Sequence, residues 1–129
     1  MTSVITAVHT LVYAQDPEAA RAFFRDVLDF PGADSGGGWL IFKTGPSELG
    51  VHPRSWEHEG NTGSTDQRFD ISLMCDDLTT TVAQLTAKGA RFDGEVRDAG
   101  WGLTIQLHIP GAGPMTLYQP KYDPPALQD

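Results

Sequence analysis

Two short stretches of mostly apolar residues set the chain's main pattern, because each ends in aspartate and leads directly into a helical repeat. The first runs from His9 to Asp16 and the second from Asp70 to Asp77. Asp70 lies 61 positions after His9, and Asp77 lies the same distance after Asp16. A repeat at fixed spacing indicates that one supersecondary unit occurs twice. His9 and Asp70 therefore occupy equivalent positions in two halves.

The first half is predicted to form a strand, a helix and two further strands. Residues 4–14 are rich in β-branched side chains and contain no glycine or proline, which is typical of a strand. Asp16 is a favourable N-cap, and apolar residues then recur on one helical face from Ala20 to Leu28. Strands are expected at 39–43 and 47–52, and the short turn between them makes the pair antiparallel.

A polar stretch follows the first half. Residues 53–68 contain glycine and show no periodicity, so 54–68 is interpreted as a linker between the halves. We expect this segment to be the most mobile internal part of the chain and to lie near the mouth of any cavity.

The second half repeats the order of elements. Residues 69–75 form the expected strand, Asp77 caps the next helix, and Gly89 ends it. Strands are predicted at 91–98, interrupted at Gly94, at 101–109 with clean alternation, and at 115–119. The tail, 121–129, contains two consecutive prolines and is expected to be poorly ordered. Cys75 lies on the helix-facing side of its strand and is interpreted as a buried structural thiol.

The alternation of side chains along these strands predicts which residues line a shared concave surface. In each half the helix covers one face of the sheet, so the other face is free. The residues expected there are His9, Leu11, Tyr13, Asp70, Ser72, Met74, Thr104, Gln106 and His108, with Thr116 and Tyr118 from the last strand.

Composition limits the size of the fold, the classes of binding partner and the cellular environment. The 129 residues suffice for one domain, taken as 1–129, and the net charge of −8 disfavours nucleic acid and anionic membranes. A single cysteine excludes an intrachain disulfide and fits a reducing, cytoplasmic environment. The N-terminal residues lack the pattern of a signal peptide, and no apolar run approaches the length of a bilayer span.

His9 and Asp70 carry the candidate chemistry. His9 is either a metal ligand, an acid–base group or a hydrogen-bonded polar residue of a ligand cavity. If the two side chains meet, they form either a base with its orienting carboxylate or an ordinary ion pair between the halves. His108 is either a ligand contact or part of a solvated sheet face.

The ordered set of short motifs resembles one known family, the glyoxalase/bleomycin resistance protein/dioxygenase family, also called the vicinal oxygen chelate superfamily. The likeness covers nearly the whole chain except the tail. It rests on residues 8–13 with Asp16, 23–24 with 27–30, 48–52, 74–77 with 85–89, and 115–120.

The resemblance implies an α+β fold in which two βαβββ modules form a cup-shaped mixed sheet with helices on its outer face. Module one is then about 1–53 and module two about 69–120. It also implies a homodimer and, in members with metal chemistry, a divalent ion in the cup. The positions that correspond to the ligands are His9, Asp70, Thr116 and Leu49. Thr116 stands where glutamate is expected and Leu49 cannot ligate, so a third ligand is missing.

Two functions follow from the resemblance. The first is a protein that binds a small organic molecule in its cup, without a complete metal site and without a cofactor. The alternative is a metal-dependent lyase, isomerase or dioxygenase that acts on a vicinal oxygen substrate through an ion at His9 and Asp70. The missing glutamate favours the first.

Overall fold

The computed structural model describes residues 9–128 and shows the α+β architecture expected from the sequence. Within these residues, neither helix is long and apolar enough to cross a membrane. The elements are the helices α1 (Pro17–Asp26) and α2 (Leu78–Ala87), the strands β1 (Gly32–Asp34), β2 (Leu40–Phe42), β3 (Ser55–His58), β4 (Asn61–Ser64), β5 (Ser72–Met74), β6 (Phe92–Asp98), β7 (Gly102–Ile109) and β8 (Gly113–Pro120), and the 3-10 helix η1 (Pro125–Leu127).

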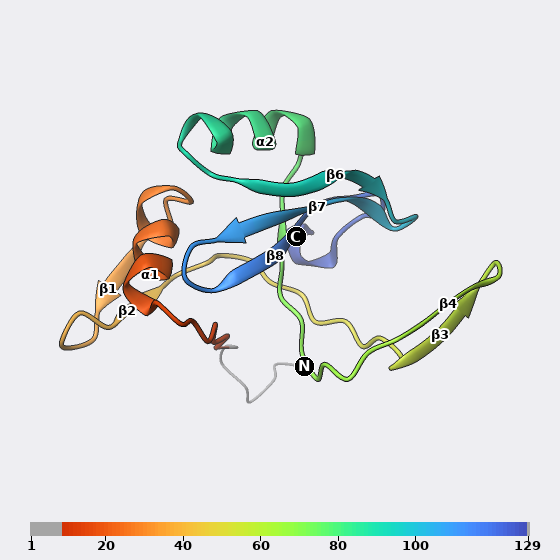
Figure 1. The fold of residues 1–129 in the computed structure, drawn as a ribbon, viewed down its shortest axis with the longest axis horizontal. Helices are drawn as coiled ribbons and strands as arrows, with labels where there is room; N and C mark the ends of the chain where they lie inside the picture. The colour runs from red at the N-terminus through yellow and green to blue at the C-terminus, as the bar shows by residue number, and fades with distance from the viewer. Residues whose placement is uncertain (1–8, 129) are drawn as a thin grey trace.

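The largest sheet belongs to the second half and has the strand order β5-β8-β7-β6 (Figure 1). β5 runs parallel to β8, and the two other neighbouring pairs are antiparallel. β6 is interrupted as the sequence predicts: Gly94 has a positive φ of 74°, and the register with β7 shifts between Asp93 and Arg97. Glycine adopts this conformation at no steric cost, so it accommodates the bulge.

The core lies between one face of this sheet and the two helices. Alternate residues of β7 are buried, among them Leu107, which is fully inaccessible to solvent. Met115 and Leu117 of β8 add to the same cluster, as do Phe23 of α1 and Leu78 of α2. The prediction that the helices cover one sheet face is therefore confirmed. The opposite face, which neither helix covers, is called the open sheet face.

The helix caps are also as predicted. Asp16 accepts a hydrogen bond from the Ala19 amide at 3.1 Å, and Asp77 accepts one from the Thr80 amide at 3.0 Å. Lys88, next to the C-terminus of α2, donates to the Val27 carbonyl next to the C-terminus of α1 at 3.1 Å. Val27 and Lys88 are 61 residues apart, so this bond joins equivalent positions of the two repeats.

Two strands expected in the first half are absent from the described residues. Residues 9–14, the described part of the strand expected at 4–14, have no regular structure, and neither do residues 47–52. Residues 9–14 include Thr10, Val12 and Tyr13, which favour strands, whereas Val51 is the one β-branched residue of 47–52. No described segment pairs with either stretch, and strand propensity acts only through such pairing. As a result, Leu49 is 90% exposed and Val51 is 96% exposed.

The segment expected to be a linker, 54–68, contains a β-hairpin, β3–β4, which the sequence pattern did not predict. The hairpin turns through Glu59 and Gly60, which both have positive φ, as a tight two-residue hairpin turn requires. The Trp56 ring lies directly over Gly63 on the opposite strand, and a Cβ at position 63 would come within 2.2 Å of that ring. The hairpin projects away from the four-stranded sheet (Figure 1).

Candidate functional site

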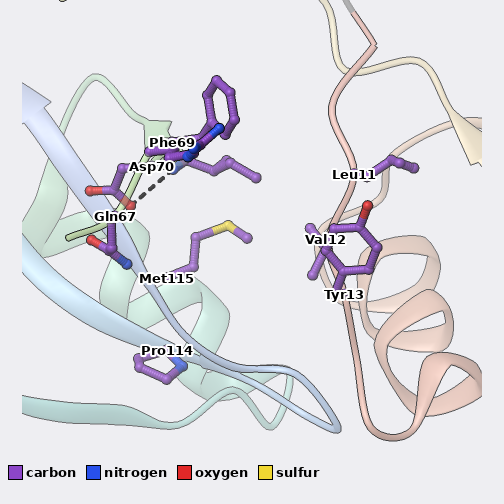
Figure 2. Close-up of a pocket in the computed structure, with 10 residues that line it drawn as sticks. Leu11, Val12, Tyr13, Gln67, Phe69, Asp70, Pro114 and Met115 are labelled. Carbon is purple, nitrogen blue, oxygen red and sulfur yellow. Dashed lines mark hydrogen bonds between the residues drawn. The ribbon is translucent and has the colours of Figure 1, made fainter.

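An open cleft of about 460 Å³ lies between the two halves of the chain. One wall is the irregular segment from Leu11 to Tyr13, and the other is the segment that leads into β5 (Figure 2). Pro114 and Met115, at the start of β8, line it as well. The complete lining is Leu11, Val12, Tyr13, Gln67, Arg68, Phe69, Asp70, Ile71, Pro114 and Met115.

The lining is mainly apolar, with few polar groups. Tyr13 and Phe69 stand on opposite walls, and each is 87% exposed. Asp70 accepts a hydrogen bond from the Ile71 amide at 3.0 Å through Oδ1 (Figure 2). An apolar cleft with a few polar groups is the usual form of a small-molecule site, and the polar groups fix the ligand's orientation.

The structure thus brings together Leu11, Tyr13 and Asp70, three of the residues that the sequence assigns to the concave surface. His9 is exposed and does not line the cleft. Within residues 9–128, no hydrogen bond or ion pair joins His9 to Asp70, whose Oδ1 is engaged by the Ile71 amide.

The remaining expected residues lie on the open face of the sheet, in rows set by strand register. Thr116 of β8 pairs with Ser72 on one side and with Gln106 on the other. The Gln106 amide donates to the Thr116 hydroxyl at 3.0 Å. In the next row, Tyr118 pairs with Met74 and with Thr104. His108, which is half-buried, pairs with Pro114 at the cleft end of β8.

A second hollow, of about 370 Å³, lies where β6 bulges away from β7. It contains Thr104 and Gln106, together with charged residues of β6. These charged residues are Asp93, Glu95, Arg97 and Asp98. The open sheet face is therefore polar and acidic at its β6 edge.

Sequence reasoning missed a polar cluster at the other end of β8. The hydroxyls of Tyr118 and Tyr122 are 2.7 Å apart, and Tyr122 also donates to the Glu48 carboxylate. Burial, followed by the hydrogen bonds to Glu48 and Tyr118, raises the pKa of the Tyr122 phenol. Tyr122 was overlooked because it belongs to the tail. Glu48 lies within a stretch that carries the family likeness, beside Leu49, and no pattern in the sequence links it to the tail.

Cys75 is half-buried, whereas the sequence predicted a buried thiol. Its Sγ donates to the Tyr118 carbonyl at 3.5 Å, and burial raises the pKa of the thiol. Both effects reduce the nucleophilicity of the sulfur, because the thiolate is the reactive form.

The residues of this structure do not fit the metal site that the resemblance implies. Leu49 offers no donor atom, and the Thr116 hydroxyl is engaged by Gln106. Among the side chains that the structure describes, no three of His, Cys, Asp or Glu come close enough together to hold a metal ion. A divalent cation needs several such ligands at one point, and the described residues do not supply them.

The sequence profile of the Glyoxalase/Bleomycin resistance protein/Dioxygenase superfamily matches residues 6–110, which is most of the chain. This protein belongs to that superfamily. No curated protein matches it.

Several solved structures share the fold at low sequence identity. A member from Nocardioides is 16% identical with a TM-score of 0.60, and the match covers 100% of this chain and 93% of the other. Lactoylglutathione lyase from Agrobacterium tumefaciens is 16% identical, with a TM-score of 0.58 and coverages of 91% and 96%. TnmS3, an antibiotic binding protein from Streptomyces sp. CB03234, is 21% identical, with a TM-score of 0.55 and coverages of 93% and 100%. At these identities the likeness shows the fold alone.

Proposed function

We propose that this superfamily member binds a small organic molecule in the cleft between its two halves and does so without a complete metal site. The observation that carries the proposal is the cleft itself, which places Tyr13, Phe69 and Asp70 around one open, mainly apolar space. The antibiotic-binding relative from Streptomyces supports a binding role for this fold. We further propose that the protein acts in the cytoplasm as a homodimer.

The substitution Asp70→Ala tests whether the cleft is the ligand-binding site. Losing one hydrogen bond to a carboxylate should cost on the order of 1 kcal/mol of unfolding free energy, because the group is exposed. Ligand binding should instead be strongly weakened. The measurement is a thermal-shift screen of a small-molecule panel that includes bleomycin, followed by calorimetry on each hit.

Asp76→Ala is the matched control, because it removes an exposed carboxylate outside the cleft. His9→Ala tests whether the neighbouring irregular segment contributes to the site. Hits that bind wild type, His9→Ala and Asp70→Ala equally would contradict the cleft as the site.

The alternative from the sequence is metal-dependent catalysis through His9 and Asp70, although His9 does not line the cleft that contains Asp70. The lactoylglutathione lyase from Agrobacterium, which shares the fold, makes a lyase activity worth testing. Elemental analysis of protein purified without a histidine tag separates the two. Stoichiometric zinc, nickel, iron or manganese, together with formation of S-lactoylglutathione, would support the enzyme and overturn the metal-free proposal.

A further inference from the structure

Tyr118 is buried although it lies on the sheet face opposite the helices. Its side chain is only 7% exposed, whereas Gln106, on the same face, is exposed. The Trp101 ring stands edge-on to Tyr118, with ring centroids 5.0 Å apart, and the Tyr122 hydroxyl meets the Tyr118 hydroxyl. Residues beside the end of β8 and in the tail therefore cover this part of the face.

The tail is held down at its start. The Lys121 amide donates to the Trp101 carbonyl at 2.9 Å, and the Lys121 ammonium forms an ion pair with Asp98 of β6. Further along, Pro124 is buried and η1 begins at the next residue. The tail turns back beside the sheet instead of extending from it (Figure 1).

The tail also reaches the first half of the chain. Tyr122 donates its hydroxyl to one oxygen of Glu48, and the Ala126 amide donates to the other at 3.4 Å. Glu48 belongs to the irregular segment between β2 and β3, so both contacts join that segment to the end of β8. A tyrosine phenol is protonated at neutral pH and can donate to the carboxylate, and the bond to Glu48 raises the pKa of Tyr122 further.

We propose that residues 121–128 form a strap that closes the Tyr118 end of the open sheet face and ties it to Glu48. A ligand that extends along this face as far as Tyr118 must displace Tyr122, so the strap restricts access in the free protein. This regulatory role rests on the proposed binding function. The strap can be tested without any ligand, so a result against the strap leaves the proposed binding function standing, and the reverse also holds.

Nitration by tetranitromethane tests the strap, because the reagent modifies accessible tyrosines and peptide mapping separates the sites. Tyr13 is highly exposed and serves as the internal reference for reagent activity. We expect the ratio of Tyr118 to Tyr13 nitration to rise several-fold in Tyr122→Ala and in a chain that ends at Lys121. Glu48→Ala should raise it as well, because both of its bonds to the tail are lost.

Gln128→Ala is the control, because it removes only a bond within the tail, from the Gln128 amide to the Asp123 carbonyl at 3.2 Å. The ratio should stay at the wild-type value in this variant. An unchanged ratio in Tyr122→Ala would contradict the proposal that Tyr122 shields Tyr118 from the reagent. A rise in Tyr122→Ala without a rise in Glu48→Ala would contradict the proposal that the bonds to Glu48 hold the strap in place. Circular dichroism of each variant confirms that it is folded before nitration.

Discussion

At the scale of single residues, Tyr122 shows how local contacts make stability depend on pH. An unfolded tyrosine titrates near pH 10, and in the folded chain burial and the bonds to Glu48 and Tyr118 raise the pKa of Tyr122. The folded state therefore favours the neutral phenol. The stabilisation is complete below about pH 10 and is lost as pH rises through the folded pKa, because the unfolded state loses its proton first.

We therefore expect the unfolding free energy of the wild type to fall above about pH 10 and to fall less steeply in Tyr122→Phe. Urea unfolding between neutral pH and about pH 11 measures both slopes. Tyr13→Phe is the control, since Tyr13 is almost fully solvated and its removal should keep the wild-type slope. Equal slopes in the wild type and Tyr122→Phe would contradict the assignment of the raised pKa.

At the scale of elements, the sequence predicts helices and strands best where local residue preferences coincide with hydrogen bonding to a neighbouring strand. The caps at Asp16 and Asp77 and the three C-terminal strands are found as expected, because each strand there has a hydrogen-bonded neighbour. Residues 47–52 were expected to form a strand, but they hold one β-branched residue, Val51, and have no hydrogen-bonded partner strand. The hairpin β3–β4 was missed because its signals, the Glu59–Gly60 turn and the Trp56–Gly63 contact, are not periodic.

Gly63→Ala tests whether the Trp56 contact holds the hairpin together. An added Cβ at this position would overlap the Trp56 ring, so the ring must move away from the opposite strand. We expect faster amide exchange across β3 and β4 and stronger acrylamide quenching of Trp56 in a Trp39→Phe, Trp101→Phe background. Thr62→Ala, at an exposed neighbouring position, should leave both unchanged. Unaltered exchange in Gly63→Ala would show that the turn alone holds the hairpin.

At the scale of the whole molecule, the alternation of side chains along the strands predicted which residues share the open sheet face. It did not predict what covers them. The rows through Thr116 and Tyr118 follow from alternation and register. The cleft depends on how the two halves meet, and the burial of Tyr118 depends on a tail that carries no periodic signal. Tertiary contacts between distant segments decide both, and a single sequence does not encode them as a local pattern.

The distribution of exposed apolar side chains bears on oligomeric state. Leu49 and Val51 are almost completely solvated, and Tyr13 and Phe69 are nearly so. Monomeric proteins rarely expose many large apolar groups without a partner. We therefore expect residues 47–52 to contact a second copy of the chain.

We expect light scattering at micromolar concentration to give about twice the chain mass of 14.0 kDa. Val51→Lys places a charge in the proposed contact and should shift the protein to the monomer mass, because burying an unpaired ammonium is costly. Val96→Lys is the matched control, since Val96 is an exposed valine of β6 in the other half. It should leave the dimer intact. A wild-type mass of 14.0 kDa would refute the dimer, and dissociation by Val96→Lys instead of Val51→Lys would move the interface to the edge of the four-stranded sheet.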